Sequence, residues 1–266
     1  MFNLSSLAHY SIGLSANINH IVAANFSSIC PFIMVSEFPR SGGNWIRDML
    51  GDCLQMPVPR FSKFPITFSA LAHSHFPTPI VKTTAVYILR DGRDVFVSHY
   101  WKSVNGVISD NSVIRRSILS KHPCLKSIIH KSDVNHTEVM SAFYDEWRIR
   151  PMGSKLNWGD HINRWLNCDA PSLVIMKYEN MHLNPHKTLF DSIKKLTGKD
   201  IDTDTIEFAI KRNSFKSKTG RLNGVVDNKS NRRTGIVGDW KNVFTEELLK
   251  KFHSDFSEAL ALGGYN

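Results

Sequence analysis

The sequence is poor in cysteine and has no long hydrophobic run. Its 266 residues contain four cysteines, which lie far apart and form no Cys-x-x-Cys pair: Cys30, Cys53, Cys124 and Cys168. This spacing argues against a cysteine metal site and against a disulfide framework, and it is typical of reduced thiols in a cytoplasmic protein. No apolar run approaches the roughly 20 residues that a membrane-spanning helix needs. We therefore expect no integral membrane span.

The N-terminal segment lacks the features of a targeting sequence. It is mildly apolar but interrupted by polar residues, and no charged region precedes an apolar one as in a signal peptide. We expect residues 1–30 to form an N-terminal arm and residues 31–266 to form a single domain. At 42% hydrophobic, a chain of this size can bury a sizeable core.

Acidic residues are outnumbered by basic ones. The sequence has 24 aspartates and glutamates but 33 lysines and arginines, which gives a net charge of +9. Such an excess indicates an anionic partner: nucleic acid, a membrane surface or a phosphorylated small molecule. Composition leaves all three open, so the motifs must decide between them.

Three short apolar runs predict buried strands, over Phe32–Ser36, Ala85–Leu89 and Ser172–Lys177. Helices are expected to begin near Trp45 and Asp94 and to include Pro185–Leu196. Near-continuous apolar strands that alternate with helices are typical of an α/β fold, with a central parallel sheet flanked by helices. Ligands of such folds collect beyond the carboxyl ends of the strands.

The turn after the first strand has the composition of an anion site. Pro39–Trp45 contains Arg40 and two adjacent glycines, Gly42 and Gly43, which let the backbone approach a ligand closely. The helix that follows offers unpaired N–H groups to the same anion. No Gly-Lys-Ser or Gly-Lys-Thr closes the turn, so it is not a Walker A loop.

Pro39–Trp45 resembles Pro-Lys-Ser-Gly-Thr-Thr-Trp, the 5′-phosphosulfate loop of cytosolic-type sulfotransferases that use 3′-phosphoadenosine 5′-phosphosulfate (PAPS). Arginine replaces the lysine, and Gly-Asn replaces Thr-Thr. The resemblance implies a P-loop-like nucleotide-binding fold in which Arg40 and four backbone amides hold the 5′-phosphosulfate, with Trp45 against the adenine. The amides are those of Ser41, Gly42, Gly43 and Asn44.

A second motif resembles the family's 3′-phosphate segment. Tyr87–Tyr100 matches its core, Arg-(two)-Arg/Lys-Asp-Val-(two)-Ser. An arginine at a strand end supplies a planar fork of donors, and a serine one or two helical turns later adds a hydroxyl to the same anion. The resemblance implies that Arg90 and Ser98 bind the 3′-phosphate.

A third motif, over Arg232–Thr245, resembles the family's Arg-Lys-Gly-(two)-Gly-Asp-Trp-Lys-(two)-Phe-Thr segment. A threonine stands where the family has lysine. The resemblance implies that four residues close over the 3′-phosphate: Arg232, Arg233, Thr234 and Gly235.

Two further resemblances concern the adenine. Lys177–Met181 is similar to the family's Tyr-Glu-Asp-Met after the third strand, which implies an adenine contact by Tyr178. Asn213-Ser214-Phe215 is similar to the Thr-Ser-Phe that opens a mobile segment in the family. That match implies a cofactor contact by Asn213 and stacking on the base by Phe215.

His73–Pro77 resembles the family's Lys-Thr-His-Leu-Pro, which implies that His75 is the general base. A hydroxyl acceptor needs such a proton acceptor, and histidine is the usual one near neutral pH. His73 stands where the family has lysine, so we expect Arg40 to stabilise the leaving oxygen. The catalytic set is therefore His75, Arg40 and Ser98.

Trp158–Trp165 resembles the family's Trp-(two)-His-(three)-Trp helix, which borders the acceptor pocket. His161, inside this segment, either touches the substrate or belongs to a buried helical face, because the same spacing suits both.

The motifs together predict a sulfotransferase that moves a sulfuryl group from PAPS to a hydroxyl or amine of a small-molecule, lipid or carbohydrate acceptor. The by-product is adenosine 3′,5′-bisphosphate (PAP). We expect no metal and no nucleic acid as partners, and a homodimer is left open. Two alternatives remain. One is a P-loop nucleotide kinase, although this sequence has no Walker A lysine. The other is a basic nucleic-acid-binding protein. Basic residues are frequent from Lys211 to Arg233, but Phe215 is the one aromatic residue among them, which counts against a nucleic-acid-binding protein.

Overall fold

The computed structural model describes residues 32–59, 68–79, 84–129, 131, 133–170, 172–230 and 232–265, with scattered positions between 11 and 26. The chain divides into two units. The first comprises Met1–Glu37, Gly42–Ile88 and Cys168–Ser214, and the second comprises Phe38–Ser41, Leu89–Asn167 and Phe215–Asn266. The predicted arm over 1–30 falls mostly outside the described residues.

The first unit carries a four-stranded parallel sheet with the strand order β2-β1-β3-β4. The strands are β1 (Ile33–Glu37), β2 (Leu71–Ser74), β3 (Ala85–Leu89) and β4 (Leu173–Lys177). β1 pairs with both β2 and β3, so that Val35 lies opposite His73 on one side and Val86 on the other. Three strands are as predicted, whereas β2 is too short and too polar for the sequence to indicate it.

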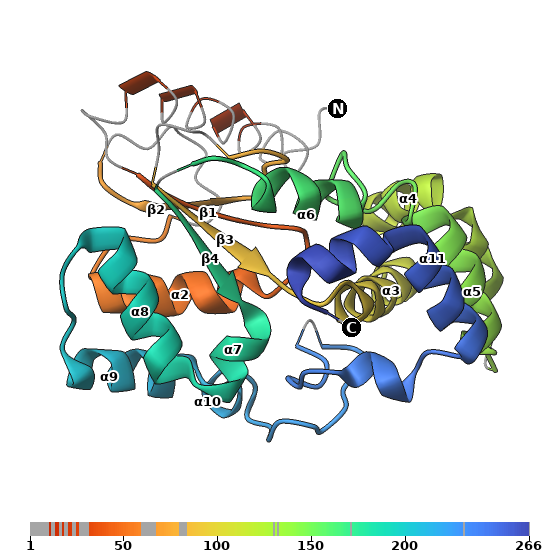
Figure 1. The fold of residues 1–266 in the computed structure, drawn as a ribbon. Helices are drawn as coiled ribbons and strands as arrows, with labels where there is room; N and C mark the ends of the chain where they lie inside the picture. The colour runs from red at the N-terminus through yellow and green to blue at the C-terminus, as the bar shows by residue number, and fades with distance from the viewer. Residues whose placement is uncertain are drawn as a thin grey trace. The chain divides into compact units, whose positions relative to one another are not determined.

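Helices α2, α8 and α9 cover one face of this sheet (Figure 1). The apolar core between them contains Val35 and Met176 from the strands and Ile46, Leu189 and Ile206 from the helices. The described helices of this unit are α2 (Gly43–Leu54), α7 (Tyr178–Leu183), α8 (Pro185–Thr197) and α9 (Thr203–Asn213).

The second unit is helical over most of its described residues. Its core is aromatic: the Phe96 ring lies 5.2 Å from Trp147, and the Trp158 ring lies 6.0 Å from Phe252. These rings come from α3 (Gly92–Ile108), α5 (His136–Trp147), α6 (Trp158–Leu166) and α11 (Glu246–Gly263). The remaining elements are α4 (Ser112–Lys121), η1 (Pro123–Ile128), α10 (Phe215–Thr219) and η2 (Asp239–Asn242).

The start of α3 organises a second segment of the same unit. Asp91 caps the helix by accepting a hydrogen bond from the Arg93 N–H, so α3 begins two residues before the predicted start at Asp94. Asp94, 2% exposed, accepts hydrogen bonds from the N–H groups of Gly238 at 2.8 Å and Trp240 at 3.0 Å. The end of the third motif is thereby tied to α3.

The predicted α/β fold, a parallel sheet flanked by helices, is confirmed. Within the part of the chain that the structure describes, every helix is too short or too polar to cross a membrane.

Replacing Asp94 by alanine should lower the free energy of unfolding, because the amides of Gly238 and Trp240 would lose their acceptor. We expect a loss of about 1–3 kcal/mol, measured by urea denaturation followed by circular dichroism. Asp191→Ala removes an exposed carboxylate from a surface ion pair with Lys187, and this control should cost less than about 1 kcal/mol. Equal losses in the two variants would contradict the role of Asp94.

Candidate functional site

The loop after β1 depends on its two glycines. Gly42 has a φ of +95°, in the left-handed region, and caps α2. A Cβ at Gly42 would come within 2.6 Å of the Tyr178 ring, so a larger residue does not fit. Gly43 leaves room for the carboxylate of Glu37, which accepts a hydrogen bond from the Gly43 N–H. The Gly43 N–H is therefore engaged by the Glu37 carboxylate.

Glu37, at the end of β1, lies beside two histidines. It is 3% exposed, and its Oε1 lies 3.4 Å from Nε2 of His73 and 3.9 Å from Nδ1 of His75. Nδ1 of His75 also lies 3.3 Å from the carbonyl oxygen of Glu37, and Nη1 of Arg47 lies 3.2 Å from Nδ1 of His73. No sequence motif indicates this cluster, because it depends on the pairing of β1 with β2.

The charge of Glu37 results from opposing effects. Burial raises its pKa, but His73, then His75 and the Gly43 amide, stabilise the carboxylate and bring the pKa below its ordinary value of 4.5. Glu37 is therefore an anion at neutral pH although it is buried.

The predicted adenine-side residues of the first unit lie together. The rings of Trp45 and Tyr178 are 5.5 Å apart, and the His182 ring is 4.7 Å from Trp45. Nε1 of Trp45 donates to the carbonyl oxygen of Asn213 at 2.9 Å. The side chain of Asn213 is 1% exposed and donates to Asp52 at 2.6 Å. Asn213 therefore orients Trp45 through its backbone, and the sequence motifs point to neither His182 nor Asp52.

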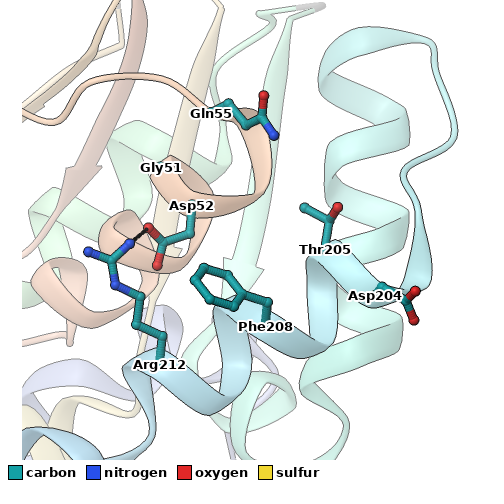
Figure 2. Close-up of a pocket in the computed structure, with 7 residues that line it drawn as sticks. All are labelled: Gly51, Asp52, Gln55, Asp204, Thr205, Phe208 and Arg212. Carbon is teal, nitrogen blue, oxygen red and sulfur yellow. Dashed lines mark hydrogen bonds and ion pairs between the residues drawn. The ribbon is translucent and has the colours of Figure 1, made fainter.

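A surface hollow between α2 and α9 adjoins this contact through Asp52 (Figure 2). Arg212 points toward Asp52, and their side chains form an ion pair of 2.7 Å. The ion pair links the end of α9 to α2 and so supports the position of Asn213. The hollow contains none of the predicted site residues; its lining is Gly51, Asp52, Gln55, Asp204, Thr205, Phe208 and Arg212.

In the second unit, Arg40, Arg90 and Ser98 come together. Nε of Arg40 donates to Oγ of Ser98 at 3.1 Å, and Nη1 of Arg90 donates to the carbonyl oxygen of Arg40 at 3.1 Å. Arg40 has a φ of +78°, a conformation that is uncommon outside glycine and clusters at functional sites. Burial and then the charge of Arg40 lower the pKa of Lys102. This concentration of donors and positive charge favours a bound anion.

Arg233 adds to the positive charge of the second unit. It forms an ion pair with Asp239, and its guanidinium lies 5.8 Å from the centre of the Trp101 ring. Burial lowers the pKa of Arg233, Asp94 opposes this effect, and the charge of Arg90 lowers the pKa further. The two arginines therefore lie within each other's field, a repulsion that a bound anion would relieve.

The other residues of the third motif shape its backbone. Gly235 has a φ of +65°, and a Cβ at this position would collide with the ring of Phe215. Thr234, the residue that replaces lysine, is 5% exposed, and its hydroxyl lies 3.2 Å from Oδ2 of Asp239. The carbonyl oxygen of Arg232 accepts a hydrogen bond of 2.6 Å from Nη2 of Arg221, which lies outside the motif. The structure thus brings Phe215 and Gly235 into contact.

Three of the predicted site residues of the second unit are buried: Thr234, His161 and Ser41. His161 is 0% exposed, with its ring 5.5 Å from Phe38 and stacked on Trp165 at 6.5 Å, so the buried-face alternative describes its position. Ser41 is 1% exposed and its N–H donates to the carbonyl oxygen of Phe38 at 3.1 Å, which closes the turn. Asn44, in the first unit, is exposed in the first turn of α2.

Comparison with known proteins gives the family. The profile of the Sulfotransferase domain family matches residues 50–264. Sulfotransferase 2A1 of Homo sapiens is 24% identical over 86% of this chain and 84% of its own length. Sulfotransferase 1A1 of Canis lupus familiaris is 23% identical over 86% of this chain and 83% of its own length.

Solved structures share the fold. Mouse sulfotransferase SULT7A1 complexed with PAP has a TM-score of 0.62 at 18% identity, over 94% of this chain and 92% of that chain. Retinol dehydratase in complex with androsterone and the inactive cofactor PAP has a TM-score of 0.59 at 15% identity, over 91% and 85%. PAP in these structures agrees with the predicted PAPS cofactor.

These matches confirm the predicted enzyme class and support neither the kinase nor the nucleic-acid-binding alternative. With its phosphate motifs in order along the chain and the family profile matched over most of its length, this chain belongs to the Sulfotransferase domain family.

Proposed function

We propose that this sulfotransferase moves a sulfuryl group from PAPS to a hydroxyl or amine of a small-molecule acceptor and releases PAP. The observation that carries the proposal is the convergence of Arg40, Arg90 and Ser98, which two separate motifs predict. Guanidinium and hydroxyl donors held together by hydrogen bonds suit a phosphate group.

The phosphate groups are assigned to two sets of residues. Arg90, Ser98 and Arg233 bind the 3′-phosphate, because the two arginines share one positive field that an anion relieves. Arg232, Thr234 and Gly235 shape the segment that closes over it. Arg40 and the backbone amides of the glycine turn, Ser41 to Asn44, bind the 5′-phosphosulfate.

The adenine is assigned to aromatic side chains. Trp45 and Tyr178 lie in contact in the first unit, and Asn213 fixes the indole of Trp45 through a 2.9 Å hydrogen bond. Phe215, in the second unit, packs on the backbone of Gly235 and is proposed to stack on the base. Aromatic faces suit this task because every base offers a π-face for stacking.

PAPS supplies an activated sulfuryl group with a stable leaving group. His75 accepts the proton of the acceptor, which makes the attacking oxygen more nucleophilic. Arg40 stabilises the negative charge that develops on the leaving oxygen, and Ser98 holds the Arg40 guanidinium by the 3.1 Å hydrogen bond. His161, buried against Phe38 and Trp165, is proposed to pack in the core rather than to touch the acceptor.

The acceptor is proposed to be an apolar alcohol or phenol, with lipids and carbohydrates as the alternatives. A related protein from Cavia porcellus, 22% identical, is a 3-alpha-hydroxysteroid sulfotransferase. Structures of retinol dehydratase contain androsterone or retinol. A cytoplasmic location is part of the proposal, and it agrees with the free thiols of Cys53, Cys124 and Cys168.

Arg90→Ala should weaken PAP binding, because the 3′-phosphate would lose a charged donor. Isothermal titration calorimetry is expected to give a dissociation constant raised by about 30-fold or more. Arg116→Ala removes an exposed arginine of α4 and is the matched control. Unchanged PAP affinity in Arg90→Ala would refute the assignment of the 3′-phosphate.

His75→Ala should remove the proton acceptor and leave the cofactor site intact. With radiolabelled PAPS and a panel of hydroxysteroids and phenols, we expect kcat to fall by about 100-fold to 10,000-fold while PAP affinity stays the same. His186→Ala, on α8, controls for the loss of an imidazole. Turnover retained by His75→Ala would show that another group is the base.

A further inference from the structure

The cluster of Glu37, His73 and His75 lies entirely in the first unit, and no family motif accounts for its carboxylate. Glu37 ends β1, His73 lies in β2, and His75 follows that strand. The charged and titratable groups facing the carboxylate are the two histidines, and the Gly43 N–H also donates to it. Behind His73 lies Arg47, whose charge is offset by Asp48 at 2.7 Å.

The contacts of His75 define which of its ring nitrogens carries the proton. Nδ1 lies 3.3 Å from the carbonyl oxygen of Glu37. A carbonyl oxygen can only accept a hydrogen bond, so Nδ1 must be the donor. In the neutral ring, the lone pair is then on Nε2, which is the form that a general base requires.

The contacts of His73 define the opposite tautomer. Nη1 of Arg47 lies 3.2 Å from Nδ1 of His73, and a guanidinium can only donate. Nδ1 therefore accepts, and the proton of the neutral ring is on Nε2, which lies 3.4 Å from Oε1 of Glu37. In this tautomer the Nε2–H of His73 faces the Glu37 carboxylate.

We propose that Glu37 is a positioning residue for the base His75, and this role rests on the proposed function. The Glu37 backbone carbonyl holds the proton of His75 on Nδ1. Its carboxylate, 3.9 Å from the same nitrogen, stabilises the imidazolium that forms when the base takes a proton. Glu37 therefore supplies a negative charge beside His75 and orients its ring. The neighbouring position, where related enzymes have a lysine, is His73.

Glu37 neither gains nor loses a proton in the catalytic step. The O–H bond of the acceptor breaks and its proton bonds to Nε2 of His75. The acceptor oxygen forms the new S–O bond, and the electron pair of the broken S–O bond remains on PAP. The carboxylate stays ionised throughout, because it accepts hydrogen bonds and does not receive the proton.

The same three side chains present ligand atoms within 4.8 Å of one another, a spacing that would suit a metal ion. Metal binding by His73, however, needs the lone pair on Nε2 and the proton on Nδ1. That proton would then face the Arg47 guanidinium, which is also a donor. The hydrogen bonds therefore favour a carboxylate–histidine arrangement over a metal centre.

Glu37→Gln tests the proposal by keeping the shape and removing the charge. We expect kcat to fall at least about tenfold, with the KM for the acceptor and the PAP dissociation constant unchanged within about twofold. A neighbouring anion favours the protonated base, so its loss should move the acid limb of the kcat–pH profile down by about one pH unit. Glu37→Asp should recover part of kcat, and Glu207→Gln, an exposed carboxylate of α9, should match the wild type.

Nuclear magnetic resonance of protein with isotope-labelled histidine tests the arrangement without turnover. We expect the Nε2–H tautomer for His73 and the Nδ1–H tautomer for His75, with the His75 signals altered in Glu37→Gln. The proposal is overturned by the reverse tautomers, by a wild-type pH profile in Glu37→Gln, or by one equivalent of Zn²⁺ bound by the wild type and lost in the variant. Absence of sulfuryl transfer by the wild type would instead refute the proposed function, and the tautomers would still decide the role of Glu37.

Discussion

The buried carboxylate of Glu37 is the interaction on which the functional end of the first unit depends. It ties the end of β1 to the first amide of α2, and it faces two histidines at the end of β2. A buried carboxylate without partners would be costly, but the Gly43 N–H and both histidines stabilise this one. Strand, glycine turn and base are therefore held in one arrangement by the same small set of contacts.

The second unit has the opposite electrostatic character. Arg40, Arg90 and Arg233 lie in one positive region, in which Asp94 and Asp239 offset part of the charge. Burial, and then the charge of Arg40, lower the pKa of Lys102. A doubly phosphorylated nucleotide is the kind of ligand that neutralises such a region, and the net charge of +9 agrees with that use.

The parts of the site that contiguous motifs encode could be predicted from the sequence. Gly42 and Gly43 are required by a left-handed turn and a close approach, and Arg90 directly follows β3, whose apolar run is unbroken. The convergence of Arg90 with Arg40 follows from two such motifs. The structure confirms the predicted order of strand, turn and helix. This order could be predicted because its features are local in the chain.

The Glu37 cluster could not be predicted, because it depends on strand register. Pairing of Val35 with His73 brings β2 beside β1, and alternation along an extended chain places His73 and His75 on one side. No local pattern states which strands pair or in what register. The burial of His161 was likewise undecided, since helical spacing suits both a core face and a pocket wall; only packing on Phe38 and Trp165 separates them.

Sulfuryl transfer is tested most directly by incubating the wild-type protein with radiolabelled PAPS and a panel of hydroxysteroids, retinoids and simple phenols. We predict that label moves to at least one acceptor and that PAP forms in equal amount. No labelled product, together with binding of ATP and magnesium in preference to PAP, would contradict the assignment of this site to sulfuryl transfer.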